Sequence, residues 1–360
     1  MADWSRRFSA SYRFMRVSRA TGMEVGRLGN VRAGGTIERN LDKAYETGSV
    51  DFVGQLDLGA DLLRVWLDAT FADGTTASEP LGTFLVSVPR AERSGGVSRG
   101  TADLSGRLRE AAEDELEPMA VPTGTNAVSH AAGMLRDAGL EVVADDSDWA
   151  TSSTWVLGAG AQDERLSTRL GAANALLEAA GFSAARTDPM GRVMLRRHVG
   201  VEGRAPSLRM EEGPLARFCD SCTDERDASG VANVVHAVYS TAEETVVGVA
   251  VDDDQESPWS TVSRGWRKSA SYSFSDLPQG DSAQARQAAA DAKARELLAS
   301  QQSVVHRVTA RHVYAPLSVG DAVDVLWPSA GIRGKFAVRR IALTLVGGCP
   351  MEMEVRRFER

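Results

Sequence analysis

The sequence predicts an α+β fold, mainly β, in which two barrel-sized blocks of strands flank a small α/β domain. Apolar residues alternate with polar ones along short segments before residue 104. They recur at helical spacing further along the chain, and the alternation then returns. We therefore expect a first β-barrel domain at 1–104, a small α/β domain at 105–204 and a second β-barrel domain at 205–360. An acidic loop and an Ala-rich helix interrupt the second barrel at about 252–302.

Length and composition limit the classes of protein to consider. The 360 residues are 43% apolar, which is enough for more than one core. The formal net charge of −8 argues against a protein that grips nucleic acid, because such a protein needs a basic face. Three cysteines do not make a disulfide framework. The N-terminus lacks the apolar core of a signal peptide, and no apolar run is long enough to span a bilayer. We expect assembly in a reducing cytoplasm.

Alternation in the first domain predicts strands with one buried face. The apolar side chains of two such segments are Val50, Phe52, Gly54 and Leu56, and then Leu63, Val65, Leu67, Ala69 and Phe71. Asp73-Gly74 predicts a hairpin turn, because Gly tolerates positive φ. The return strand carries Phe84, Val86 and Val88. Short strands joined by frequent turns indicate a barrel or a sandwich.

Helical spacing marks the middle domain. The charged segment 104–116 favours helix, and Thr125 is placed to cap a second helix whose buried stripe ends before Gly139. A third helix is expected from Asp163 to Gly181, followed by short strands at 182–186 and 192–196. The stripes of the second and third helices are Val128, Ala131, Ala132 and Leu135, and Leu166, Leu170, Ala173 and Leu177.

Strands return in the last domain, with one long helix among them. We expect strands at 231–239 and 245–251, joined by a polar turn at 242–244. Asp281 or Ser282 caps the Ala-rich helix, which runs to about Ala299. This helix is suited either to close packing against a partner or to a plain surface role. The expected final strands lie at 304–313, 323–325, 335–345 and 351–355.

Residues that could carry chemistry do not form a motif. Cys219 and Cys222 make a C-x-x-C pair, but a zinc site needs four ligands, and His236 and Cys349 lack the spacing of a zinc knuckle. His306 and His312 share a face of one expected strand but lie too far apart to share a ligand. The acidic runs at 145–148 and 252–254 lack the Gly and Glu of a calcium loop. We therefore assign no catalytic, cofactor-binding or metal residues and expect no cofactor and no enzyme activity.

At this point the order of segments resembles a known family: the baseplate or tail-tip hub proteins of tailed bacteriophages, which share a fold with the hubs of contractile injection systems. The resemblance is carried in the first domain by 12–39, 49–52 and 81–86, in the middle by 176–182 and 191–195, and at the end by 317–323, 334–338 and 350–353. It spans nearly the whole chain. Many hub proteins carry an enzymatic or fibre-like C-terminal extension, and this chain stops just after the last expected strand, so we expect no lysin activity.

The resemblance implies a symmetry adapter in the virion. A homotrimer of such chains would present six tail-tube-like barrels to a sixfold tail tube, with a central channel for the genome and the tape-measure protein. The implied partners are the distal tail or tail-tube ring, the tape-measure protein and tip or fibre proteins, with DNA only in transit. The implied location is the tail tip, after assembly in the host cytoplasm. A ring of this kind closes through heterologous contacts, which would cover exposed strand edges.

One alternative stays open on the residues themselves. Four tryptophans could stack on sugars in a tail-associated protein that binds or degrades the cell wall: Trp149, Trp155, Trp259 and Trp266. Core or interface packing is the simpler explanation for each of them, because they lack repeat spacing. A cytoplasmic multidomain enzyme is disfavoured because the sequence holds no nucleophile or phosphate motif.

Overall fold

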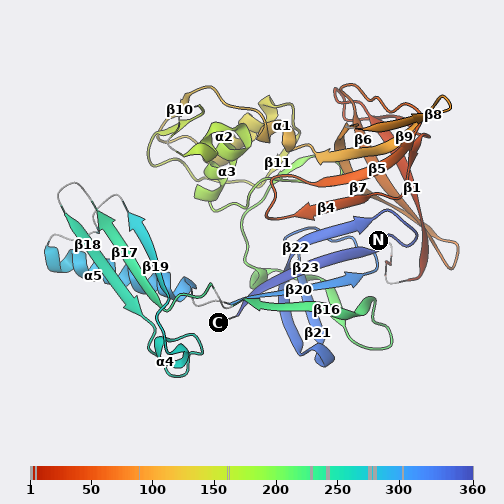
Figure 1. The fold of residues 1–360 in the computed structure, drawn as a ribbon. Coiled ribbons are helices and arrows are strands. Elements are labelled where there is room, and N and C mark those ends of the chain that lie inside the picture. Colours follow the sequence, from red (N-terminus) through yellow and green to blue (C-terminus); the bar gives the residue numbers. More distant parts are fainter. Residues whose placement is uncertain are drawn as a thin grey trace. The chain divides into compact units, whose positions relative to one another are not determined.

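The computed structural model describes residues 3–4, 6–88, 90–159, 161, 163–227, 230–240, 244–274, 278, 282–301 and 304–359. The chain is mainly β with several helices, as predicted (Figure 1). It divides into two compact units, each described by itself below. Residues 1–222 and 309–355 form the larger unit, here called the body. Residues 223–308, with 356–360, form the smaller unit, here called the insert module. None of the helices among the described residues is long and apolar enough to cross a membrane.

The first block of strands confirms most of the alternation predicted from the sequence. Val50 and Phe52 are buried on one face of their strand, and so are Leu63, Val65, Leu67, Ala69 and Phe71 on theirs. The prediction fails at two strand ends, because Leu56 lies beyond its strand and is half-buried, and Val88 follows its strand and is 37% exposed. The strands of this block are β1 (Phe8–Val17), β2 (Glu24–Arg27), β3 (Val31–Arg32), β4 (Thr36–Asn40), β5 (Thr47–Val53), β6 (Leu62–Phe71), β7 (Thr76–Ser87), β8 (Ala91–Ser94) and β9 (Val97–Gly106).

The small α/β domain follows with its own core. Its elements are α1 (Arg109–Ala112), β10 (Met119–Val121), α2 (Ala127–Asp137), β11 (Val142–Ala144), β12 (Trp155–Leu157), η1 (Glu164–Ser167), α3 (Arg169–Ala179), β13 (Arg186–Thr187), β14 (Val193–Leu195) and η2 (Val201–Gly203). The predicted apolar stripes of α2 and α3 are buried, except that Leu166 precedes α3 and is half-buried.

Three predictions in this domain were wrong in detail. The strand expected at 182–186 is only β13, which overlaps it at Arg186. The helix expected at 104–116 is only the single turn α1, because Leu104 to Gly106 complete strand β9 by pairing with both β5 and β7. The cap of α2 is Asn126 rather than Thr125. The Asn126 side chain accepts a hydrogen bond from the Ser129 amide at 2.9 Å, which satisfies one of the free amides of the first turn.

The second block of strands joins the first in one fifteen-stranded sheet, ordered β16-β20-β23-β22-β4-β5-β9-β7-β6-β1-β2. Outside this path β3 pairs with β5, β8 with β9, and β21 with both β22 and β15, the last in parallel. The strands of the second block are β15 (Pro206–Glu211), β16 (Phe218–Asp227), β20 (Val304–His312), β21 (Ala322–Trp327), β22 (Ile332–Thr344) and β23 (Met351–Glu359), with a turn of 3-10 helix, η3 (Pro328–Ala330), before β22.

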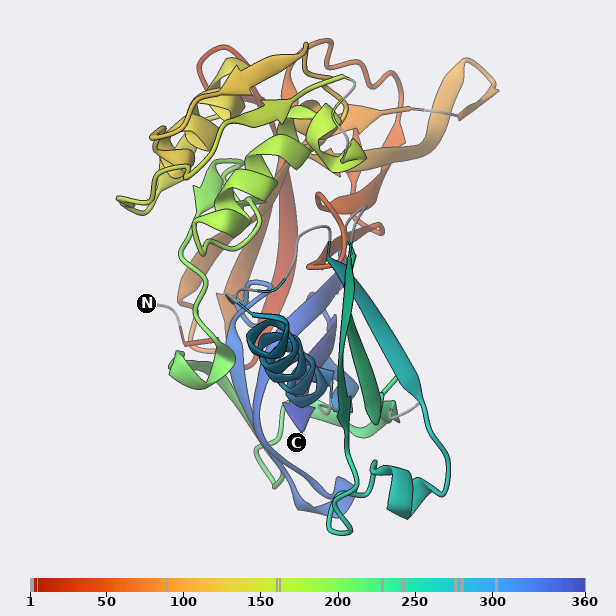
Figure 2. The ribbon, with the colours of Figure 1, turned by 90° about the vertical axis from the view of Figure 1, so that its left-hand side faces the viewer.

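The insert module is a three-stranded sheet covered on one face by a helix. Its elements are β17 (Val234–Ser240), β18 (Thr245–Val251), α4 (Thr261–Arg264), β19 (Ser269–Phe274) and α5 (Ala283–Gln301). The strand order is β18-β17-β19, with β17 and β19 parallel. Figure 2 shows α5 lying along one face of this sheet. Their shared core is made of small residues and one leucine: Ala232, Val235, Ala237, Ala250, Ala294 and Leu298.

The insertion is therefore larger than the sequence indicated. The strands predicted at 231–239 and 245–251 were expected in the second barrel, but they pair with each other and with β19 in a separate sheet. They leave the body because α5 supplies the second layer that a sheet needs to bury one face. The Ser282 hydroxyl caps α5 by accepting from the Ala285 amide. Asp281, the other predicted cap, and the turn residues 242 and 243 lie outside the described residues.

Candidate assembly site

The two β blocks meet along β4 and β22, a junction that we call the seam. The strands pair antiparallel from Thr36 opposite Thr344 to Asn40 opposite Arg340. Beyond their ends, the Gly34 amide donates to the Leu345 carbonyl and the Leu345 amide donates to the Gly35 carbonyl, both at 2.9 Å. A Cβ at position 35 would lie 1.8 Å from the carbonyl oxygen of Ser49, so only glycine fits there. The seam is thus an unbroken run of main-chain hydrogen bonds.

Ion pairs line the half-exposed side of the seam. Arg340 on β22 donates to Glu38 on β4 at 3.0 Å and to Glu352 on β23 at 2.8 Å. Lys43 donates to the second oxygen of Glu38 at 3.0 Å. Partial burial acts to raise the pKa of Glu38, but these two cations outweigh it and hold the pKa below its usual value. The hydrogen bond to Glu352 raises the pKa of Arg340 above its usual value. Each charge on this side of the seam therefore has a partner from another strand.

The opposite side of the seam is closed by polar groups that find main-chain partners. The Tyr12 hydroxyl donates to the Val346 carbonyl at 2.6 Å, next to the fully buried thiol of Cys349. Arg39 on β4 donates to the Leu81 carbonyl. Burial lowers the pKa of Arg39 and raises that of Cys349 to about 11. Buried polar groups that are satisfied in this way favour one arrangement of the strands over its alternatives.

A cluster of aromatic rings provides a second contact between the blocks. Trp4 is buried edge-on against Phe8 and Phe71 of the first block. Its ring also lies 4.8 Å, centroid to centroid, from Tyr314 of the second block. The Trp4 carbonyl accepts a hydrogen bond from Arg217 at 3.0 Å. The start of the chain is therefore packed between both blocks.

The α/β domain is fixed to the first block by hydrogen bonds to loop carbonyls. Arg186 donates to the carbonyls of Leu41 and Lys43, each at 2.6 Å, and so covers the turn between β4 and β5. On a neighbouring face, Arg64 donates to the Met190 carbonyl at 3.1 Å. This contact explains why Arg64 is buried although it lies on the polar side of β6. All three parts of the body are thereby held in one arrangement.

Several strands of the sheet offer edges with no partner among the described residues. The path ends at β2 and β16, and β8 and β15 each pair on one side only. All four residues of β8 are exposed. The side chain of Met23, just before β2, is 69% exposed, and that of Val25 on β2 is 59% exposed. Unpaired edges are templates for pairing with another chain, so these strands are candidate contact surfaces.

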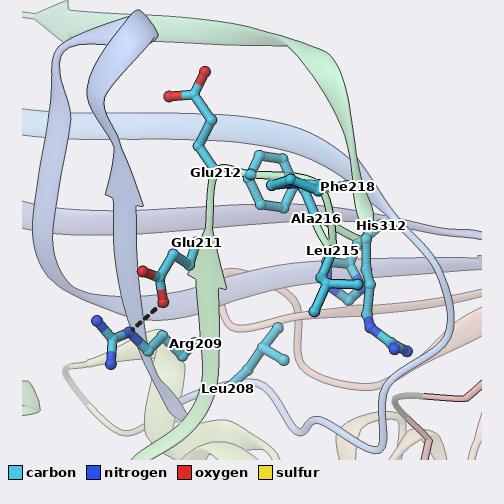
Figure 3. A pocket seen from close by; sticks show the side chains of 11 residues that line it. Leu208, Arg209, Glu211, Glu212, Leu215, Ala216, Phe218 and His312 are labelled. Carbon is cyan, nitrogen blue, oxygen red and sulfur yellow. Dashed lines mark ion pairs between the residues drawn. The ribbon is translucent and has the colours of Figure 1, made fainter.

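A shallow hollow of about 330 Å³ lies between the end of β15 and the start of β16 (Figure 3). Leu208 and Leu215 give it an apolar floor and rim, and Leu215 is 88% exposed. Arg209 and Glu211 form an ion pair at 3.2 Å beside it. Burial lowers the pKa of His312, whose ring closes the far end. A single neutral imidazole among leucines and paired charges suits contact with another surface better than group transfer.

The cysteines and histidines weighed in the sequence lie in different surroundings. Cys219 and Cys222 are on β16 and Cys349 is buried behind the seam, and no disulfide joins any of the three. His306 and His312 are both on β20, where His306 is fully buried and lies 2.5 Å from Asp224. Across the described part of the chain, no three His, Cys, Asp or Glu side chains cluster as metal ligands would. A metal role for Cys219 and Cys222 thus has no supporting geometry.

The four tryptophans divide into two pairs. Trp149 and Trp155 pack against the core of the α/β domain, as the simpler explanation holds. Trp259 and Trp266 both lie against the Arg264 guanidinium in the insert module. The sequence named both residues of this second pair but not the arginine that contacts them.

No protein-family model and no curated protein matches the sequence. Solved structures do. A tail protein from Neisseria meningitidis MC58 aligns over 96% of this chain and 97% of its own length, with a TM-score of 0.65 and 14% identity. The 43 kDa tail protein of prophage MuSo2 from Shewanella oneidensis aligns over 97% and 98%, with a TM-score of 0.59 and 9% identity. The chain has the fold of phage tail proteins.

The same fold is found in a chain of a two-protein complex. The Francisella PdpA-VgrG complex aligns over 98% of this chain and 55% of the matched chain, with a TM-score of 0.56 and 9% identity. The tail-protein fold covers the body and the insert module together, since the aligned shares approach the whole chain. The resemblance seen in the order of segments is thus confirmed at the level of the fold.

Proposed function

We propose that this protein is a structural hub of a phage tail, which assembles as a homotrimer and adapts the sixfold tail tube to a threefold tip. The observation that carries the proposal is the seam. One chain contains two blocks of strands joined edge to edge in a single sheet, with their mutual arrangement fixed by buried contacts. Three copies would supply six blocks.

Symmetry gives the seam its role in this proposal. A ring closes only if each subunit is related to its neighbour by the same rotation, and if these rotations add up to a full circle. The two blocks of one subunit would occupy neighbouring positions in a six-membered ring. The angle between the two blocks must therefore be fixed by contacts within the chain. The free edges of β2, β8, β15 and β16 are then available for contacts between subunits.

The proposed partners and location follow from the same role. Above the trimer lies the ring of the distal tail or tail-tube protein, and below it lie tip or fibre proteins. The central channel admits the tape-measure protein and DNA in transit, and the net charge of −8 keeps phosphate contacts weak. We place the protein in the virion at the tail tip, after assembly in the host cytoplasm, and propose that it has no catalytic activity of its own.

Mass measurement and electron microscopy of the purified protein test this proposal. We expect a mass of three chains, stable at micromolar concentration, and threefold rings with a central hole in two-dimensional class averages. A monomer at high concentration, or a closed dimer, would contradict it. Addition of the tail-tube protein should give end-on complexes in which a six-membered ring sits on the trimer.

Charge reversal at the seam tests its role in ring closure. Arg340→Glu removes the ion pair with Glu38 across the seam and the ion pair with Glu352 inside the second block, and it places like charges together, so we expect fewer closed rings. Arg13→Glu is the matched control, because Arg13 pairs with Asp68 between β1 and β6 inside the first block at similar exposure. Equal loss of rings in both variants would argue against a specific role of the seam.

A further inference from the structure

The loop between β18 and β19 in the insert module is held by a fully buried asparagine. The Asn233 amide group donates to the Trp259 carbonyl at 3.2 Å and to the Trp266 carbonyl at 3.0 Å. Its oxygen accepts from the Lys268 amide at 2.7 Å. One side chain just before β17 thus fixes three points of the loop, which restricts the positions of both tryptophans.

The first half of the loop is equally constrained. Asp252 is 6% exposed, and its carboxylate accepts from the Ser257 hydroxyl at 2.8 Å and the Asp254 amide at 3.2 Å. Ser260 is buried and caps α4 by accepting from the Ser263 amide. A loop with this many internal bonds is organised before any ligand arrives, which reduces the entropy cost of binding.

This organised loop presents one tryptophan to solvent. The Arg264 guanidinium lies 5.2 Å from the ring centroid of Trp259 and 5.5 Å from that of Trp266, and it also donates to the Val231 carbonyl at 2.8 Å. Trp266 is nevertheless 54% exposed. Arg264 packs against the ring of Trp266 and holds it in place, so the exposed part of the indole offers a fixed flat surface to solvent. A large exposed aromatic group on a rigid loop is characteristic of a binding site.

The chemistry around Trp266 favours a sugar. An indole face stacks well on the C–H face of a pyranose ring. The same loop carries three exposed carboxylates, on Asp253, Asp254 and Glu256, with no ion pair to any cation of the described chain. Carboxylates accept hydrogen bonds from sugar hydroxyls. The four acids of the loop, which include Asp252, outnumber its three cations, Arg264, Arg267 and Lys268, so the loop has no net positive charge to attract a phosphate-bearing polymer. We propose that the insert module binds an uncharged polysaccharide through Trp266 and this loop, a function beyond that of a hub.

Binding of neutral polysaccharides by the full-length protein tests the proposal. The probes are dextran, mannan and oligomers of N-acetylglucosamine, titrated calorimetrically, with teichoic acid as the anionic comparison. We expect at least one neutral probe to bind and teichoic acid not to bind. Trp266→Leu keeps an apolar side chain but loses the flat ring, so its affinity should fall about tenfold or more. Trp266→Tyr keeps a stacking ring and should stay within about threefold of the wild type.

Leu215→Ala is the control for loss of an exposed apolar group, since Leu215 lies in the body and is 88% exposed. It should bind as the wild type does. Failure to bind every neutral probe, or unchanged affinity in Trp266→Leu, would overturn the proposal. Retained glycan binding by a protein that proves monomeric would leave this inference standing while the hub proposal fails. If Trp266→Leu instead releases a co-purifying tail protein and no glycan binds, the loop is a protein contact and the proposal is wrong.

Discussion

Cys349 and Cys219 carry the same thiol in opposite surroundings. Burial raises the pKa of Cys349 to about 11, whereas Cys219 is exposed on β16. Because the thiolate is the reactive form, we expect an alkylating reagent at pH 8 to modify Cys219 quickly and Cys349 only after denaturation. Peptide mass spectrometry over time measures this, and Cys219→Ser removes the fast phase. Rapid modification of Cys349 in the folded protein would show that the seam opens.

Glu38 makes the seam sensitive to acid. Its pKa is lowered in the folded chain, so its ion pairs add stability at pH values above the unfolded carboxyl pKa of about 4.3. That contribution is lost as the pH falls through the folded pKa. We expect Glu38→Gln to lower the free energy of unfolding by about 1–2 kcal/mol at pH 7. The difference from the wild type should vanish near pH 2. Urea unfolding at both pH values measures it.

At the scale of single residues, the sequence named candidate side chains but not the contacts between them. Trp259 and Trp266 were both singled out as aromatic candidates, but their pairing depends on Asn233, which lies 26 residues or more before them in the chain. No spacing rule links that asparagine to either ring. The burial of Arg64 was equally hidden, because the residue that covers it, Met190, belongs to a different domain.

Packing of α5 on its sheet depends on one glycine. A Cβ at Gly248 on β18 would lie 2.1 Å from the carbonyl oxygen of Ala290 on α5. Gly248→Ala should therefore push the helix off the sheet and destabilise the insert module by about 1–3 kcal/mol. Hydrogen exchange of the amides of β17 and β18 measures this locally.

Gly133→Ala is the matched control, since that helical glycine has open space around it and alanine favours helix. It should stabilise the protein slightly. Unchanged protection of β17 and β18 in Gly248→Ala would mean that α5 is not seated as described.

Strands with strong alternation were predictable at the level of the element. The strand at 245–251 has the predicted bounds, and the final strands bury the predicted side. Strand β19 went unpredicted although Ala270, Tyr272 and Phe274 do alternate with serines. Helix ends were less reliable, because one residue of difference in the cap, from Thr125 to Asn126, is decided by which side chain reaches a free amide.

The whole molecule has a chain order that the sequence predicted correctly, from β through α/β to β with a helical interruption. The sequence did not predict that the two blocks form one sheet. This depends on β4 pairing with β22, and no local sequence pattern indicates which distant strand will be the partner. The extent of the insert was also missed, because its strands have the same alternation as those of the body.

The insert module should be removable from the body. The chain leaves along β16 and returns along β20, which are neighbours in the sheet, and the Val313 amide donates to the Arg217 carbonyl at 3.0 Å near its base. Replacement of 223–308 by Asn-Gly, a favoured two-residue hairpin turn, should leave a folded body with the oligomeric state of the full chain. Circular dichroism and light scattering measure both. An aggregated or unfolded product would show that the two units fold only together.

The seam also has a consequence for folding during synthesis, because its two strands are made at different times. Glu38 and its partner Arg340 are 302 positions apart, so β4 emerges from the ribosome long before β22. At about 5–20 residues per second, its edge waits on the order of 15–60 s for its permanent neighbour. During that interval the nascent chain displays an incomplete sheet, open to mispairing with other nascent chains. Slower, cooler expression or a holding chaperone should therefore raise the yield of native protein more than any change to the mature surface.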